Sequence, residues 1–111
     1  MELREEQLGD VKALAVHGRL DSASAPDLDG RLQAAIAAPG SRLVVDFARL
    51  DYISSAGFRV LLVAAKAAET EGRRLVLCGL TGPVRQLFDI GGFLQLFTIA
   101  HSRDEAIALA R

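Results

Sequence analysis

Two adjacent serines, Ser54 and Ser55, lie just before Ala56 and Gly57, between an apolar pair and a segment with helical periodicity. A serine in this position can cap the helix by accepting a backbone N–H bond. A hydroxyl there can also be modified, because Ala56 and Gly57 make the turn small and open, so that another protein could reach it. Glycine in a first turn weakens a helix by up to roughly 1 kcal/mol relative to alanine, which indicates close approach by another backbone or a ligand. The turn therefore admits two interpretations, a helix cap and a modification site.

Catalysis has little support in the residue pattern. Ser55, His17 and Asp21 could form a Ser/His/Asp set because triads are not contiguous in sequence, but Ser55 does not lie in a GxSxG elbow. The chain has no GxxxxGK[ST] or GxGxxG phosphate-binding motif and no HExxH, and His17 and His101 are not at metal-ligand spacing. A nucleotide-binding domain with an anion site at the 54–57 turn is the alternative of this class. We expect no enzyme activity, no cofactor and no metal.

The composition is that of a small folded domain. A chain of 111 residues with 50% hydrophobic content predicts one domain, residues 1–111, with a real core. A net charge of −1 without a block of like charge argues against nucleic-acid binding and against a basic membrane-surface helix. The charged N-terminus is unlike a signal peptide, and no stretch approaches transmembrane length. The single cysteine, Cys78, lies in an apolar run and is expected to be buried. We expect a cytoplasmic protein that does not insert into membranes.

Strand and helix patterns alternate along the chain, which predicts an α/β fold with a mixed, mostly parallel sheet. Apolar runs at 42–47 and 74–79 suit strands buried on both faces. Residues 11–18 and 96–100 favour further strands, and residues 2–9 favour an edge strand joined to the first of these by a turn at Gly9 and Asp10. Helices are expected to begin near Ser24, Ser54, Thr81 and Ser102, the last with a capping box to Glu105, and the first and third to stop at Pro39-Gly40 and Gly91-Gly92.

The helix that begins at the serines has two distinct faces on a helical wheel. The face expected against the sheet carries Phe58, Leu61, Ala64, Ala65 and Ala68, and the opposite face carries Arg59, Lys66 and Thr70. Val63 lies within the polar stripe and Leu62 lies beside it. Such apolar residues among charges favour a partner surface, but single exposed apolar residues are also common, so both interpretations stay open.

Three segments in order resemble the STAS domain, and specifically the anti-sigma factor antagonists. They are "GRLD" at 18–21, "VDFARLDYISSAGFRVLL" at 45–62 and "VRQLFDIGGFLQLF" at 84–97. The resemblance covers essentially the whole chain. It implies a STAS fold, with a mixed, mostly parallel sheet of four to five strands packed with about four helices.

The resemblance also implies the site residues. The phosphorylated serine of the family aligns with Ser55, and Ser54, the alternative acceptor, stands where many members carry aspartate. Asp21 matches a family aspartate near the acceptor. The implied partner-binding residues are Asp21, Ser54, Ser55, Ala56, Gly57, Arg59, Leu62, Val63 and Lys66.

In the mechanism that the resemblance implies, the unmodified protein binds an anti-sigma factor and thereby releases a sigma factor. The anti-sigma factor is typically an ATP-binding serine kinase of the histidine-kinase-like type, which phosphorylates the antagonist and dissociates. A serine phosphatase then restores binding. The alternative within the same fold is a STAS subunit of a stress-signalling or lipid-transport complex without sigma-factor control.

Overall fold

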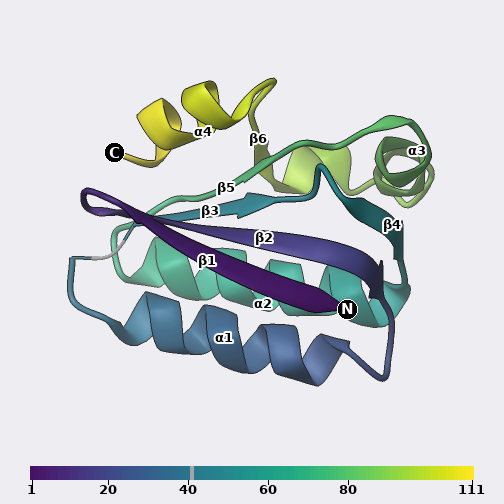
Figure 1. Ribbon diagram of the computed structural model, residues 1–111, viewed down its shortest axis with the longest axis horizontal. Helices are drawn as coiled ribbons and strands as arrows, with labels where there is room; N and C mark the ends of the chain where they lie inside the picture. The colour runs from purple at the N-terminus through teal and green to yellow at the C-terminus, as the bar shows by residue number, and fades with distance from the viewer. Residues whose placement is uncertain (41) are drawn as a thin grey trace.

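The computed structural model describes residues 1–40 and 42–111, which form a six-stranded sheet with helices on both of its faces (Figure 1). Along the chain the elements are β1 (Glu2–Leu8), β2 (Val11–Leu20), α1 (Ala25–Ala37), β3 (Arg42–Asp46), β4 (Leu50–Ile53), α2 (Ser55–Thr70), β5 (Leu75–Cys78), α3 (Gly82–Ile90), the 3-10 turn η1 (Leu94–Leu96), β6 (Thr98–Ile99) and α4 (Arg103–Ala110).

The sheet is mixed and mostly parallel, as predicted. Its order is β1-β2-β3-β5-β6, and only the β1–β2 pair among the described strands is antiparallel. Besides β1, the ten-residue strand β2 has two parallel neighbours: its first half pairs with β3 and its last residues pair with β4. A backbone bond of 3.0 Å from Gly18 N to Arg49 O joins the second pair.

The prediction of four to five strands was wrong by one, because β4 was not expected as a strand. Its four residues include an exposed Asp51 and a half-buried Tyr52, so they show no continuous apolar run. The strand exists because β2 extends beyond the end of β3 and offers it a partner. The last strand was also predicted too long, since residues 94–96 form a 3-10 turn and only two residues pair with β5.

Alternate residues of the central strands enter two separate cores. Leu43 and Val45 of β3 pack with the residues under α1 and α2, whereas Val44 packs with the residues under α4. Figure 1 shows the two long helices on one face of the sheet and α4 on the other. The apolar runs at 42–47 and 74–79 are therefore buried on both faces, as their composition predicted.

Helices α1, α2 and α4 return against the direction of the parallel strands, so their carboxyl ends gather where those strands begin (Figure 1). Arginines satisfy several free carbonyls there. Arg73 Nη1 donates to Ile36 O at 2.8 Å and to Ala38 O at 2.9 Å, and Arg42 Nη1 donates to Ala110 O at 3.3 Å. A cavity of about 520 Å³ opens between these arginines. Their positive charge offsets the negative helix ends, so they act as caps for helices elsewhere in the chain.

The helices begin where expected, but their caps differ. The Ser102 hydroxyl accepts from Glu105 N at 3.1 Å, and the Glu105 carboxylate accepts from His101 N, one residue before the cap. The Ser24 hydroxyl instead donates to Arg19 O and accepts from Asp21 N, both at 3.0 Å. Among the described residues, the Thr81 hydroxyl accepts no bond from the first turn of α3.

Candidate functional site

Ser54 is the N-cap of α2. Its backbone is extended, with φ −95° and ψ 172°, and its hydroxyl accepts from Gly57 N at 3.5 Å. Its own N–H donates to Leu20 O at 2.9 Å, which ties the start of α2 to the end of β2. The capping interpretation of the serine pair therefore belongs to Ser54.

Ser55 is the first residue of α2 and is exposed. Its hydroxyl makes no hydrogen bond to another residue within 1–40 or 42–111. Because Ser54 already serves the first turn, the Ser55 hydroxyl is open to another protein. The two adjacent serines thus have different environments.

Gly57 is buried, and its neighbours explain its residue type. A Cβ atom at this position would lie 2.8 Å from both Ile53 Cγ1 and Leu20 Cγ, and 3.0 Å from Leu20 Cδ2. Real Cβ atoms essentially never approach other atoms this closely. The sequence suggested close approach by another backbone or a ligand, but the approaching groups are two core side chains of the protein itself. Gly57 lets α2 begin directly on the ends of β2 and β4.

Asp21 lies next to the serines, because it directly follows Leu20, whose carbonyl receives the Ser54 N–H. Its carboxylate accepts from Ser24 N at 3.1 Å and from Ala23 N at 3.0 Å, and the Ser24 hydroxyl oxygen lies 3.2 Å from the same carboxylate oxygen. These bonds, those from Ser24 above all, lower the pKa of the Asp21 carboxyl. Asp21 is thus an ionised, half-buried group that fixes the turn from β2 into α1.

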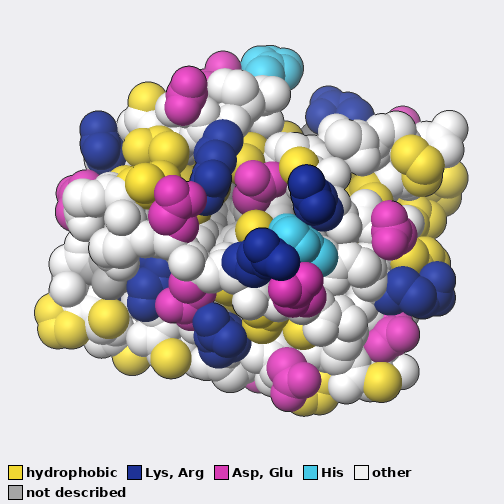
Figure 2. All heavy atoms as spheres, viewed as in Figure 1, with side chains coloured by type: hydrophobic (Ala, Val, Ile, Leu, Met, Phe, Trp, Pro, Cys, Tyr) yellow, Lys and Arg dark blue, Asp and Glu magenta, His cyan; other side chains and the backbone are white. Residues whose placement is uncertain are grey.

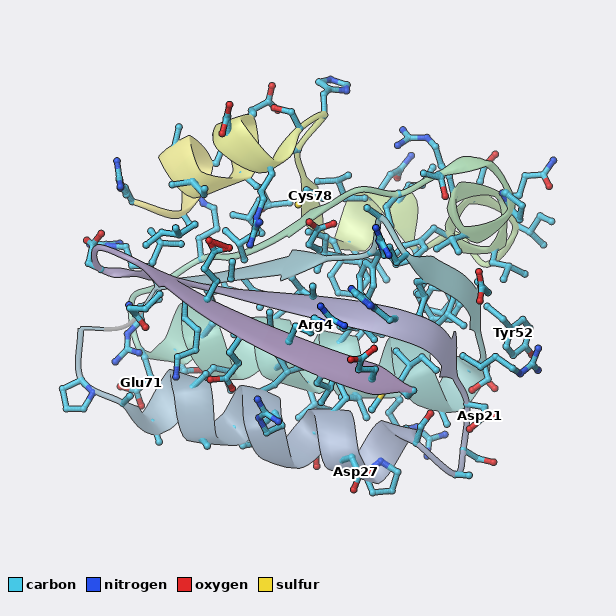
Figure 3. The ribbon with its side chains drawn as sticks, in the orientation of Figure 1. Arg4, Asp21, Asp27, Tyr52, Glu71 and Cys78 are labelled. Carbon is cyan, nitrogen blue, oxygen red and sulfur yellow. The ribbon has the colours of Figure 1, made fainter. Side chains whose placement is uncertain are left out.

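Arg19 and Tyr52 also lie at this end, and sequence reasoning missed both. The guanidinium carbon of Arg19 lies 4.4 Å from the centroid of the Tyr52 ring, a cation–π contact. The two residues are direct partners in the β2–β4 register. Figure 3 shows Asp21 and Tyr52 at one end of the molecule and Glu71, which follows α2, at the other. No local signal could have paired them without knowledge of β4.

The burial of the α2 side chains confirms the two faces predicted from the helical wheel. Of the five residues expected against the sheet, Ala65 is half-buried and the other four are buried. The outward face carries the exposed residues Ser55, Arg59, Val63 and Lys66, with Val63 51% exposed. Ala56 and Leu62 are half-buried at its margins. The structure therefore brings eight of the nine predicted partner-binding residues to one end and one helix face, and places the ninth, Gly57, beneath them.

The face of the molecule seen in Figure 2 shows interleaved charges. Figure 2 shows acidic and basic side chains alternating over the visible face, without a large area of one sign. Arg31 pairs with Glu5 at 2.7 Å and Arg103 pairs with Glu6 at 3.0 Å. The hydrogen bond from Arg31 lowers the pKa of the Glu5 carboxyl. This pattern is that of an ordinary solvated face.

The described residues do not bring together the Ser/His/Asp set considered from the sequence. His17 Nδ1 lies 3.7 Å from Glu2 Oε1 on the sheet, and within the described residues no hydrogen bond joins His17 to Ser55 or Asp21. No group of three potential metal-ligating side chains occurs in the part of the chain that the structure describes. In the same residues no helix is long and apolar enough to cross a membrane.

Comparison with known proteins identifies relatives of nearly the whole chain. The family model of the STAS domain matches residues 3–106. The chain is 41% identical over 108 residues to BtrV of Bordetella bronchiseptica, which is named among the anti-sigma factor antagonists, and the match covers 97% of this chain and 93% of BtrV.

Solved structures show the same fold. An anti-sigma factor antagonist from Mycobacterium paratuberculosis superposes with a TM-score of 0.88 at 21% identity, covering 99% of this chain and 93% of that one. The antagonist SpoIIAA superposes with a TM-score of 0.74 in both its unphosphorylated and its phosphorylated forms, at 17% and 20% identity. These matches cover 96% and 99% of this chain, and 94% and 100% of the SpoIIAA chains.

Proposed function

Since this chain belongs to the STAS domain family, we propose that it is an anti-sigma factor antagonist whose binding to an anti-sigma factor is switched by phosphorylation of Ser55. One observation carries the choice of residue: Ser54 is used as the helix cap, whereas the adjacent Ser55 presents an exposed hydroxyl. The similarity to BtrV over nearly the whole chain supports the class of function.

The proposed partner is an anti-sigma factor that is also an ATP-binding serine kinase, and a serine phosphatase reverses the modification in the cytoplasm. The partner surface is the outward face of α2 together with Asp21 and the two serines. The existence of SpoIIAA structures in both phosphorylation states supports the idea that this fold accommodates the modification.

The switch has a simple physical basis. A phosphoryl group adds about −1.5 to −2 charges at pH 7, and at the first residue of α2 the fold tolerates that charge. In an interface the same group adds bulk, desolvation and repulsion, and like charges there cost several kcal/mol. Roughly 2.7 to 4 kcal/mol already weakens binding by about 10²- to 10³-fold. The fold therefore survives while the partner is lost.

The site of modification is tested by intact-mass and fragment-ion analysis of the protein purified from its native cells. Substoichiometric phosphate on Ser55 is the expected result. Phosphate on Ser54 would keep the switch but move its acceptor by one residue. A protein without phosphate under every growth condition would contradict the switch and favour a constitutive STAS subunit of another complex.

The effect on binding is tested with the co-purifying anti-sigma partner. We expect Ser55→Ala to keep the affinity of the unmodified protein, and Ser55→Asp and Ser55→Glu to weaken it. Ser54→Ala tests the alternative acceptor, since it removes the neighbouring hydroxyl that serves as the cap. Equal affinity for all the Ser55 variants would overturn the proposal.

A further inference from the structure

Arg59 lies one helical turn after Ser55 on the outward face of α2, and both residues are exposed. Side chains at positions i and i+4 of a helix are neighbours, with Cβ atoms about 5–6 Å apart. Unlike Arg31 and Arg103, which pair with glutamates, Arg59 has no hydrogen bond or salt bridge to the described residues. It is therefore an uncommitted cation within reach of the Ser55 hydroxyl.

The outward face of α2 has a composition that selects for a partner. Between Ser55 and Lys66 its exposed side chains are two cations, Arg59 and Lys66, on either side of the apolar Val63. The chain as a whole carries a net charge of −1, so this positive stripe differs from the average surface. On a partner that contacts this face, charge complementarity would favour acidic groups around an apolar contact.

We propose that Arg59 is the cationic half of the switch. While Ser55 is unphosphorylated, the Arg59 guanidinium binds an acidic group of the partner. When Ser55 is phosphorylated, its phosphoryl group pairs with Arg59 and withdraws the guanidinium from that contact. The proposal rests on the proposed phosphorylation of Ser55. Phosphorylation then acts twice, because it adds an anion to the interface and removes a cation from it.

The chemistry of the two groups favours this pairing. A guanidinium binds phosphate oxygens through two parallel N–H bonds, which makes arginine better suited than lysine for this contact. The order also fits, since an anion placed four residues before a cation is the favourable arrangement on a helix. Lys66 lies 11 residues after Ser55, about 16 Å along the axis, and cannot compete for the phosphoryl group.

The pairing is tested without kinase or partner, on protein in which phosphoserine is incorporated at position 55 during translation. The titration of the phosphoserine is followed by ³¹P NMR in the otherwise unchanged protein and in R59Q, R59K and K66Q. Because the positive charge of Arg59 favours the dianionic form of the phosphoserine, we expect the titration midpoint of the phosphoserine to be higher in R59Q. The expected rise is about 0.2–0.4 pH units, which corresponds to the energy of exposed i, i+4 charge pairs. The midpoint in K66Q should equal that of the unchanged protein, and the midpoint in R59K should lie between those of the unchanged protein and R59Q. Identical midpoints in all four proteins would overturn the pairing.

The withdrawal of Arg59 from the partner is tested by measuring partner affinity in a double-mutant cycle. The cycle combines the R59Q substitution with the presence or absence of the phosphoryl group on Ser55. We expect R59Q to weaken binding of the unphosphorylated protein by about 2- to 5-fold and to reduce the penalty of phosphorylation by the same factor. K66Q should weaken binding but leave that penalty unchanged. An equal penalty in R59Q and the unchanged protein would reject the role of Arg59 while leaving the switch at Ser55 intact. A phosphoserine without any penalty would instead reject the proposed function, whatever the NMR result.

Discussion

At the scale of single residues, backbone geometry separates the two serines. Only a residue with extended backbone before the helix can turn its side chain onto the third N–H of the first turn, and Ser54 meets this condition toward Gly57. Ser55 already lies within the helix, and its hydroxyl accepts no bond from those donors. The order Ser-Ser-Ala-Gly therefore supplies a cap, a free hydroxyl and room for close packing in four consecutive positions.

Gly57→Ala is expected to destabilise the protein even though alanine favours helices. The added methyl group would meet the Cγ atoms of Leu20 and Ile53, which are not flexible chain ends, and overpacking of this kind costs about 1–3 kcal/mol. The gain in helix propensity is at most about 1 kcal/mol. Urea unfolding should show a net loss in the free energy of unfolding.

Gly30→Ala is the matched control, since Gly30 lies in α1 with nothing within 4 Å of the added Cβ. There we expect a gain of about 0.5–1 kcal/mol. A Gly57→Ala protein as stable as the unchanged chain would contradict the packing explanation for this glycine.

At the scale of elements, α1 depends on a residue far along the chain. It has no basic residue in its last turn, and its carboxyl end is instead capped by Arg73, which precedes β5. Two bonds below 3.0 Å from one half-buried guanidinium nitrogen join the end of α1 to the start of β5. This contact holds α1 against the sheet at the end opposite to the serines.

Arg73→Met should therefore lower the free energy of unfolding by about 1.5–3 kcal/mol, the range for hydrogen bonds to charged groups. Methionine keeps most of the apolar stem, so the loss reports the guanidinium. Arg74→Met is the control with the same change in charge, because exposed Arg74 makes only a longer bond of 3.4 Å to Leu109 O. Equal urea midpoints for the two variants would show that Arg73 is not a structural cap.

At the scale of the whole molecule, the sheet divides the interior into a larger core under α1 and α2 and a smaller one under α4. Cys78 belongs to the smaller core and is 1% exposed, as the apolar run around it predicted (Figure 3). Burial raises the pKa of its thiol to about 11, and the negative charge of Asp46 adds to the effect. The folded state thus holds the thiol neutral at pH values where the unfolded chain ionises it.

The stability of the protein should consequently fall as the pH rises from about 9 to about 11. In that window the unfolded state has lost the thiol proton that the folded state keeps, so each pH unit removes up to about 1.4 kcal/mol. Urea unfolding of the unchanged protein and of Cys78→Ala between pH 8 and 11 isolates this contribution, because the other titrating groups are common to both. Parallel pH dependences would contradict the raised pKa.

Sequence alone determined the features that depend on local periodicity and local residue types. Apolar runs predicted the strands at 42–47 and 74–79, and a 3.6-residue period predicted the exposed face of α2. The residue types of the serine turn also made it the predicted site. These signals lie within a single element, so they can be read without knowing what packs against it.

Tertiary structure decided what depends on residues far apart in the sequence. Strand β4 exists because β2 extends beyond the end of β3. Arg73 caps a helix that ended 36 residues earlier at Ala37. Position 57 must be glycine because Leu20 and Ile53 leave no room for a Cβ atom. The same holds for the serines, whose different environments depend on the bond that ties Ser54 to the end of β2. Local propensity cannot encode such contacts, because their geometry is set only when the whole sheet has formed and its neighbours have been packed against it.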